Sequence, residues 1–205
     1  MKESYIAKDF RKTAAQCFPE KADALCAAFD ARLNELRAEY ADASNALRQH
    51  LESQIMPGIA AYETLQSVMP KDEALGTVHG YVEALSRQYH KYFVALLRLP
   101  GLYRVLPGFA AKATRKNFGT AAGFAATELR TDKDVWRVDM TKCPYHDACV
   151  KHGCPELCPC FCDSDDVSYS DLHPKLVWHR ETTLGRGKHH VKLLLPYAMG
   201  GMVGT

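Results

Sequence analysis

The stretch CPYHDACVKHGCPELCPCFCDSD, from Cys143 to Asp165, holds six of the chain's eight cysteines together with His146 and His152. Most residues before it follow the three-and-four spacing of apolar side chains that is typical of amphipathic helices. The segments on either side of it alternate between apolar and polar residues, as β-strands do. The sequence therefore predicts an α+β fold. An N-terminal helical half packs on a small C-terminal antiparallel sheet, and the cysteine-rich stretch is a connection between strands.

Three segments around this stretch have the pattern of strands. In DVWRVDM (residues 134–140), Trp136, Val138 and Met140 alternate with charged residues, so their side chains should share one face. KLVWHRETT and HHVKLLLPY follow the cysteine-rich stretch, and the glycine-rich link LGRGK between them is typical of a turn. We predict that these last two segments pair as an antiparallel hairpin.

Apolar residues in the first half of the chain recur at helical spacing. Residues 21–51 carry such a stripe and contain neither glycine nor proline, which predicts one long helix. Three more helices, each bounded by proline or glycine, are predicted over residues 56–70, 71–99 and 102–116. The chain then consists of a helical region, 1–130, and a cysteine-rich α+β region, 131–205, which we expect to form one integrated domain.

The composition is that of an ordinary globular protein, and it excludes several classes. The 205 residues carry a net charge of +2, which is too balanced to indicate a nucleic-acid-binding protein. The chain has no apolar run long enough to span a membrane, and its polar N-terminus lacks the pattern of a signal peptide. We therefore expect a cytoplasmic protein without stable disulfides. The long amphipathic helix would permit a homo-oligomer.

The segment YFVALLRLPGLYRVLPGFAA, residues 92–111, comes nearest to a membrane span, but Arg98, Arg104 and two prolines interrupt it. We predict buried helices here. The alternative is a helix that lies on a membrane surface, because three basic residues follow the segment.

The spacing of the cysteines does not fit the common metal sites. It reads C-x5-C-x4-C-x3-C-x-C-x-C, whereas structural zinc sites and iron–sulfur clusters usually contain C-x2-C pairs or related spacings. A non-catalytic protein that binds zinc or an iron–sulfur cluster nevertheless stays open as the alternative to an enzyme. Its ligands would come from Cys143, Cys149, Cys154 and Cys158, with His146 or His152 in place of a thiol.

A catalytic thiol is the other explanation for the cysteines. A free thiol is only slightly ionised at neutral pH, so a nucleophilic cysteine needs a helix N-terminus or a cation beside it. Cys162 precedes DSDDVSY, in which Asp163 and Ser164 are typical N-cap residues, so we place Cys162 at the start of a helix. The nearby carboxylates need a cation, and Arg180 on a predicted strand is the candidate.

Several motifs resemble one family of hydrolases. CPYHDACVKHGCPELCPCFCDSD and LHPKLVWHRETTLGRG, with PGIAAYETL and RLPGLYRVLP upstream, are similar to the bacterial L-2-amino-thiazoline-4-carboxylic acid hydrolases. The resemblance implies the ring-opening hydrolysis of a cyclic amidine of the thiazoline type, at a C–N or C–S bond that is not a peptide bond. It also implies an N-carbamoyl or S-carbamoyl cysteine as product. The expected partner is a small-molecule substrate, and no cofactor is expected.

The chemistry of that reaction suggests roles for the matching residues. The ring carbon between sulfur and nitrogen is electrophilic, so we assign Cys162 as the nucleophile and Cys143 as a second essential thiol. Asp165 is assigned either as general base or as the group that holds the cationic amidine, and His146 is assigned as proton shuttle. The substrate-binding candidates are Arg180, which would hold the substrate carboxylate, Thr183 and Tyr145.

One part of the family pattern is missing. The family closes with a Cys-Asp-Phe element on its last strand, whereas this chain has Val191, Lys192 and Leu193 there. An alkyl group thus replaces a thiol, and an ammonium group replaces a carboxylate. If those groups react in the family, this chain has lost the activity or acts on a different, more acidic substrate.

Overall fold

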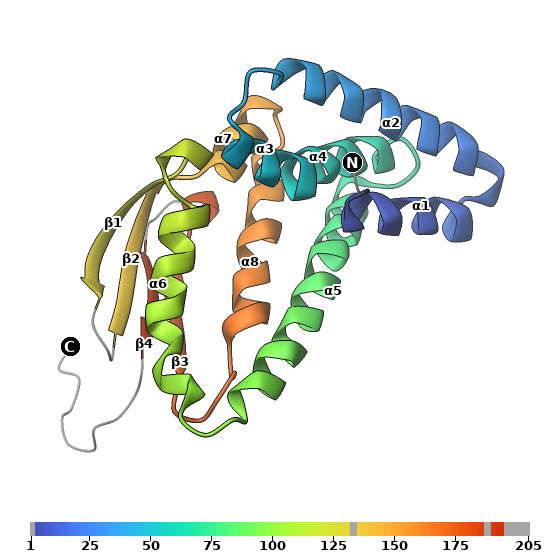
Figure 1. Cartoon of the computed structure of the whole chain (residues 1–205). Coiled ribbons are helices and arrows are strands. Elements are labelled where there is room, and N and C mark those ends of the chain that lie inside the picture. The colour runs from blue at the N-terminus through green and yellow to red at the C-terminus, as the bar shows by residue number, and fades with distance from the viewer. Residues whose placement is uncertain (1–2, 132–134, 187–189, 195–205) are drawn as a thin grey trace.

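The computed structural model describes residues 3–131, 135–186 and 190–194 of the chain. Helices α1 to α6 precede the first strand, and α7 and α8 lie between the second strand and the third (Figure 1). The helices are α1 (Tyr5–Cys17), α2 (Ala22–Glu39), α3 (Asn45–His50), α4 (Met56–Leu65), α5 (Lys71–Leu97), α6 (Leu106–Asn117), α7 (Pro144–Lys151) and α8 (Cys158–Tyr169). The strands are β1 (Ala125–Thr131), β2 (Val135–Lys142), β3 (Val177–Thr182) and β4 (His190–Leu194).

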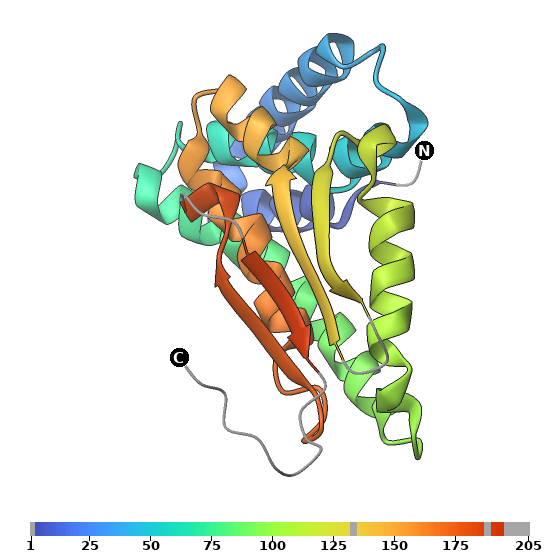
Figure 2. The same cartoon turned by 90° about the vertical axis from the view of Figure 1, so that its left-hand side faces the viewer.

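The four strands form one antiparallel sheet in the order β1-β2-β4-β3. β4 pairs with β3, as the predicted hairpin requires, and its other edge pairs with β2, where Lys192 lies opposite Arg137. Figures 1 and 2 show α5, α6 and α8 together on one side of this sheet. The α+β class predicted from the sequence is confirmed.

The single helix predicted over residues 21–51 is wrong, because the chain forms two helices there. α2 ends at Glu39, and after a turn the Ser44 side chain caps α3 by accepting a hydrogen bond from the Leu47 N–H at 3.1 Å. Serine competes well for such a backbone donor, so local capping outweighs the continuous apolar stripe. The buried residues of α2 are Leu25, Phe29, Leu33 and Leu36.

The sequence pattern does not predict β1, and the proposed boundary at residue 130 falls inside this strand. The sequence AATELRT has no apolar alternation, because β1 lies at the edge of the sheet with Ala126, Thr127 and Glu128 exposed. Pairing with β2, and not a local pattern, therefore makes this segment a strand.

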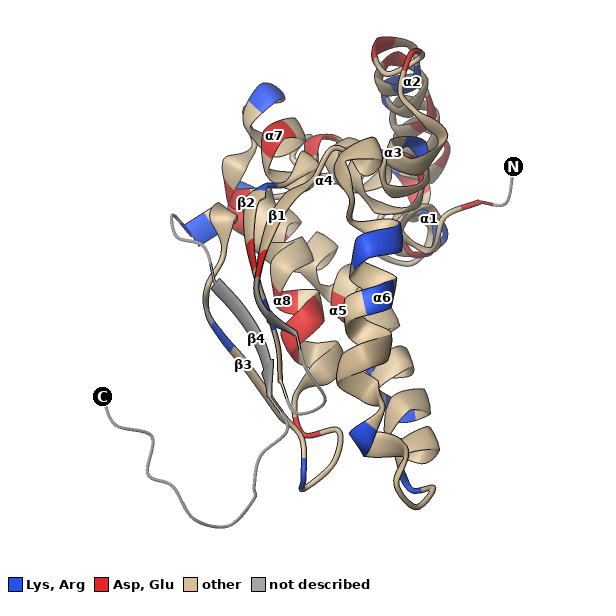
Figure 3. Ribbon diagram, turned by 60° about the vertical axis from the view of Figure 1, so that its left-hand side comes forward, with Lys and Arg blue, Asp and Glu red and all other residues tan. Residues whose placement is uncertain are grey.

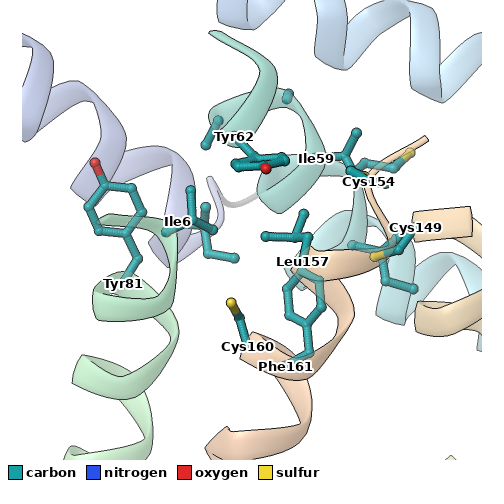
Figure 4. Close-up of a cluster of buried hydrophobic side chains, with 14 of the residues drawn as sticks. Ile6, Ile59, Tyr62, Tyr81, Cys149, Cys154, Leu157, Cys160 and Phe161 are labelled. Carbon is teal, nitrogen blue, oxygen red and sulfur yellow. The ribbon is translucent and has the colours of Figure 1, made fainter. Parts of the chain in front are cut away.

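One main hydrophobic core joins the N-terminal helices to the cysteine-rich stretch. Ile6 of α1, Ile59 of α4 and Phe161 of α8 belong to the same buried cluster, which Figure 4 shows around Leu157. At Gly58 a Cβ atom would lie only 2.6 Å from Cζ of Phe161, so a glycine is needed for this close approach. α8 therefore packs directly on the N-terminal helices.

The apolar segment 92–111 is only partly buried, which corrects the prediction of buried helices. It spans the end of α5, a short 3-10 helix at Leu102–Arg104 and the start of α6. Leu97 is 3% exposed, but Tyr92 and Phe109 are 64% and 65% exposed. None of the helices in the described ranges is long and apolar enough to cross a membrane.

The prediction that Cys162 lies at the start of a helix is also wrong. α8 begins at Cys158, and Cys162 lies in its second turn. Pro159 stands in the first turn, where a residue without an N–H loses no helical hydrogen bond. The helix can therefore begin before the Asp163–Ser164 pair that resembles a cap.

Candidate active site

A cavity of about 370 Å³ lies between one face of the sheet and helices α5, α6 and α8. β2 lines it with Trp136, Val138 and Met140, which share this face as their alternation in the sequence predicts. β3 adds Trp178 and Arg180. The sheet thus forms one wall of the cavity, and the helices form the other.

One side of α8 runs along the cavity. Cys158, Cys162, Asp165 and Tyr169 all line it, and their spacing of i, i+4, i+7 and i+11 places them on one side of a helix. Figure 3 marks the acidic segment of α8 in red. The cavity therefore has thiols near one end, a carboxylate in the middle and an aromatic ring near the other end.

Most of the site residues proposed from the sequence meet in this cavity. They come from the start of α7, from α8, from β3 and from the residue after β3. The lining includes Cys143, Tyr145, Cys162, Asp165, Arg180 and Thr183. His146 is not a lining residue, and its Nδ1 atom lies 3.7 Å from the Asp147 carboxylate.

The thiols of α7 and α8 interact with one another. Cys149 and Cys162 hydrogen-bond to Cys158 and lower the pKa of the Cys158 thiol, and nearby His146 acts in the same direction. The hydrogen bond to Cys158 is the main cause of a raised pKa at Cys162, and hydrogen bonds to Cys154 and Cys158 raise the pKa of Cys149. The cluster therefore ionises as a unit, and the hydrogen bonds from Cys149 and Cys162 favour negative charge at Cys158.

The same thiols also differ in how much of their surface is exposed. Cys149 and Cys158 are fully buried, whereas Cys162 is partly exposed. Cys162 is therefore the member of the cluster that a ligand can reach. Cys143 precedes the first turn of α7, but its burial raises the pKa to about 12, although the N–H groups of His146 and Tyr145 act to lower it. Cys143 thus stays protonated at neutral pH.

Arg180 is the buried cation beside the acidic residues, and its guanidinium is already engaged. Its Nη1 donates to the carbonyl oxygen of Cys162 at 2.7 Å, and its Nη2 donates to the Asp166 carboxylate. Trp178 Nε1 donates to the other oxygen of Asp166 at 2.6 Å. Asp166 is thus held from two sides, whereas Asp165 lies 3.6 Å from Arg180 and lines the cavity.

Asp165 is the cavity carboxyl group with a shifted pKa. Burial raises its pKa to about 6, while Arg180 acts to lower it and Asp166 to raise it. A water-sized molecule still reaches 51% of its side-chain surface, because the cavity lies in front of it. A carboxyl group with this pKa can take up and release a proton near neutral pH. Since Cys162 is one helical turn away, both groups can face one bound molecule.

Thr183 offers a donor to the same region. Its side chain is 7% exposed, and its hydroxyl oxygen is buried. It lies beside the Cys162 thiol, whose pKa it acts to lower. A hydrogen-bond donor in this position favours the ionised form of the Cys162 thiol.

The turn after Thr183 approaches α8 very closely. At Gly185 a Cβ atom would lie 2.9 Å from the Cys158 sulfur, so any larger residue must displace one of the two segments. Arg186 donates two hydrogen bonds to the Asp163 carboxylate, at 2.6 and 2.9 Å, and so ties this turn to the helix. The thiol cluster is therefore covered on this side by backbone.

Sequence reasoning misses His50, which positions Tyr145 in the cavity wall. Nε2 of His50 donates to the carbonyl oxygen of Asn117 at 2.8 Å, so in the neutral ring Nδ1 accepts from the Tyr145 hydroxyl, 3.1 Å away. The rings of Phe118 and Phe124 pack against the same imidazole. No motif links His50 to Tyr145, because they meet only through the fold.

The described residues contain no group of three or more His, Cys, Asp or Glu side chains that could hold a metal ion. All eight cysteines are free thiols.

The element that departs from the family pattern lies on β4. Val191 pairs through its backbone with Val138 and Arg180, and Lys192 pairs with Arg137. The side chains of Val191, Lys192 and Leu193 lie outside what the structure describes. The backbone of this element is nevertheless next to both strands that line the cavity.

A family model of the L-2-amino-thiazoline-4-carboxylic acid hydrolases matches residues 48–191. The matched range includes every residue that lines the cavity. No curated protein and no solved structure matches the chain.

Proposed function

The chain belongs to the L-2-amino-thiazoline-4-carboxylic acid hydrolase family, as its motifs predict, and we propose that it opens a cyclic amidine of the thiazoline type at Cys162 and Asp165. One observation carries this proposal. An accessible thiol and a carboxyl group of raised pKa lie one helical turn apart and line a single cavity. The amidine carbon, between the ring sulfur and the ring nitrogen, is the electrophile.

In the first step, the Cys162 sulfur adds to the amidine carbon while its proton passes to the Cys158 thiolate. The ring nitrogen, protonated beforehand, takes up the electron pair of the C=N bond. The contact between the two thiols supports this step, because Cys162 hydrogen-bonds to Cys158 and lowers the pKa of that thiol. Since Cys158 is fully buried, it serves as proton acceptor while the accessible thiol forms the new bond.

In the second step, the C–S bond of the ring breaks. The ring sulfur leaves with the electron pair and takes the proton back from Cys158. Breakage of the C–N bond instead would give the S-carbamoyl product. After C–S cleavage the amidine carbon stays attached to Cys162 as a cationic isothiourea, whereas after C–N cleavage it stays attached as a cationic iminodithiocarbonate.

Water completes the reaction with Asp165 as general base. One proton of the water passes to Asp165 as the oxygen adds to the amidine carbon. The carbon–sulfur bond to Cys162 then breaks, and the remaining hydroxyl proton passes to that sulfur as the carbonyl forms. Asp165 finally releases its proton to solvent, so the net reaction consumes one water.

Three neighbouring residues are proposed to bind the substrate or to position the reacting groups. Thr183 would direct its hydroxyl at the Cys162 sulfur and so favour the ionised form of the nucleophile, whose pKa it acts to lower. Arg180 is a positioning residue in this proposal, since its guanidinium is taken by Asp166 and by the Cys162 carbonyl and is not free for a substrate carboxylate. Cys143, which stays protonated, would serve as a neutral donor and not as a second nucleophile.

The test compares Cys162→Ala and Asp165→Asn with two matched controls, Cys17→Ala at an exposed thiol and Asp147→Asn at a half-exposed carboxylate outside the cavity. Consumption of L-2-amino-thiazoline-4-carboxylate is followed by chromatography, and circular dichroism checks the fold. The site variants should lose turnover at least about hundredfold, and the controls should retain it. Normal turnover in both folded site variants would refute the proposed chemistry.

A further inference from the structure

The cavity is longer than the reaction requires. The α8 residues that line it run from Cys158 to Tyr169, a rise of about 17 Å along a helix. The reacting groups occupy only the half between Cys158 and Asp165. The other half is lined by large apolar and aromatic side chains: Phe93, Leu106, Phe109, Trp136, Tyr169 and Trp178.

The volume agrees with this division. A cavity of about 370 Å³ lies within the range of pockets that enclose drug-sized ligands, about 300–1,000 Å³. A single five-membered ring with its amino and carboxylate groups fills only the thiol end. Apolar space of this kind is poorly filled by water and favours an apolar occupant.

We propose that the substrate carries a large apolar substituent, an aryl or extended alkyl group, which lies in the aromatic half while the amidine ring meets Cys162 and Asp165. This inference rests on the proposed function and names its substrate class.

The entrance supports the same assignment. Phe109 and Phe118 line the cavity and are also exposed, so the opening lies along α6 and has aromatic rings at its edge. Ala110 and Ala113 on the same helix leave the passage wide. An apolar group would therefore meet apolar surface from the entrance to the Cys162–Asp165 pair.

Turnover of a series of ring-substituted 2-amino-thiazolines tests the proposal. The substituents are hydrogen, methyl, butyl and phenyl. Each methylene that becomes buried should raise kcat/KM about fourfold. Ala113→Phe narrows the passage and should remove this gain, whereas Ala95→Phe, at an exposed alanine of α5 outside the cavity, should keep it. Equal kcat/KM across the series would overturn the inference.

Binding separates this inference from the proposed function. The chain's only tryptophans, Trp136 and Trp178, both line the cavity, so their fluorescence reports its occupancy without turnover. An unreactive aromatic pair, 2-amino-4-phenylthiazole and 2-aminothiazole, is titrated against the full chain. Tighter binding of the phenyl compound supports the substrate class, whether or not a thiazoline is opened. If the phenyl compound binds more tightly but no thiazoline is opened, the proposed function fails and the substrate class stands. Equal binding of the two compounds refutes the substrate class.

A second inference rests on a different observation, the outer surface of the α5–α6 hairpin. This hairpin extends away from α1 and α2 (Figure 1). Most of the large apolar side chains that the described part of the chain exposes lie on it. We call them the hairpin surface: Tyr89, Tyr92, Leu96, Leu99, Val105 and Phe109.

The charge of the same segment points to the partner. Residues 88–127 contain six Lys and Arg and no Asp or Glu, and five of these six cations remain for a partner because Arg115 pairs with Glu128 at 2.6 Å. In Figure 3, α6 carries blue segments and no red ones. Two copies of so basic a surface would repel each other, whereas anionic lipid headgroups attract it while the aromatic rings enter the interface. We infer that the hairpin surface binds an anionic lipid membrane.

Sedimentation with vesicles tests this second inference. The full chain should bind vesicles that contain phosphatidylglycerol but not pure phosphatidylcholine, and high salt should release it. The double variant Leu96→Ser, Leu99→Ser should lose most of the binding, whereas Val150→Ser, at an equally exposed residue of α7, should not. Absence of binding to anionic vesicles would refute the inference. So would a dimer in solution that the double variant dissociates, because the surface would then bind a second copy.

Discussion

The pH dependence of turnover tests the role of Asp165 most directly. A general base must be ionised to act, and burial raises the pKa of this carboxyl group to about 6. The value of kcat/KM should therefore be high above pH 7 and should fall as the pH decreases through 6. For one group with this pKa, about 90% of the enzyme is active at pH 7 and about 10% at pH 5.

The acid limb of the pH profile, where kcat/KM falls as the pH decreases, should shift when the neighbouring cation Arg180 is removed. Arg180 lowers the pKa of Asp165, so Arg180→Gln should move the limb to higher pH. Arg186→Gln is the matched control, because Arg186 pairs with Asp163, and it should leave the limb in place. The assay is kcat/KM measured at constant ionic strength between about pH 4 and 8. A limb near the usual aspartate pKa of about 4, or one that does not move in Arg180→Gln, would refute the reasoning.

Four further outcomes are expected. The pKa of Asp165 is higher in the folded state than in the unfolded state, so the folded protein loses stability as the pH rises from about 4 to 6. Asp165→Asn should therefore raise Tm at pH 7 and leave Tm unchanged at pH 3. No gain in Tm at pH 7 would contradict this. Gly58→Ala should lower the free energy of unfolding, measured with denaturant, by about 1–3 kcal/mol, because the new Cβ would clash with Phe161. At Gly76 a Cβ would meet no atom within 4 Å, so Gly76→Ala should stabilise α5 by up to about 1 kcal/mol. Ser44→Ala should cost about 1 kcal/mol through the lost cap of α3, and an unchanged midpoint would argue against that cap. Elemental analysis of anaerobically purified protein should find zinc and iron below one equivalent, and stoichiometric metal that Cys143→Ser abolishes would favour the metal-binding alternative.

Sequence periodicity predicts those elements whose environment repeats along the chain. The alternation of Trp136, Val138 and Met140 predicts β2 and the side of it that lines the cavity, because one face of a strand meets the same surroundings at every second residue. The stretch that follows Pro70 likewise predicts α5, which begins at Lys71. Periodicity fails for β1, whose exposed residues carry no apolar pattern and whose strand structure depends on β2.

The candidate site was predictable as a set of groups but not as an arrangement. Six of the seven proposed residues line one cavity, since the motifs place a thiol, a carboxyl and a guanidinium group in one short region. The partners of each group were not predictable. Asp166 accepts hydrogen bonds from Arg180 and Trp178, and the Cys162 carbonyl oxygen accepts one from Arg180. These three hydrogen bonds join α8 to β3.

By itself, the sequence determined the α+β class, the family, and the thiol and carboxyl groups available for chemistry. Only the tertiary structure decided which of these groups lie together. It places Cys158 against Cys149 and Cys162, which lowers the pKa of Cys158, leaves Cys162 partly exposed, and raises the pKa of Asp165. The physical reason is that ionisation and access depend on burial and on distances between segments far apart in the chain, whereas residue patterns report only local periodicity.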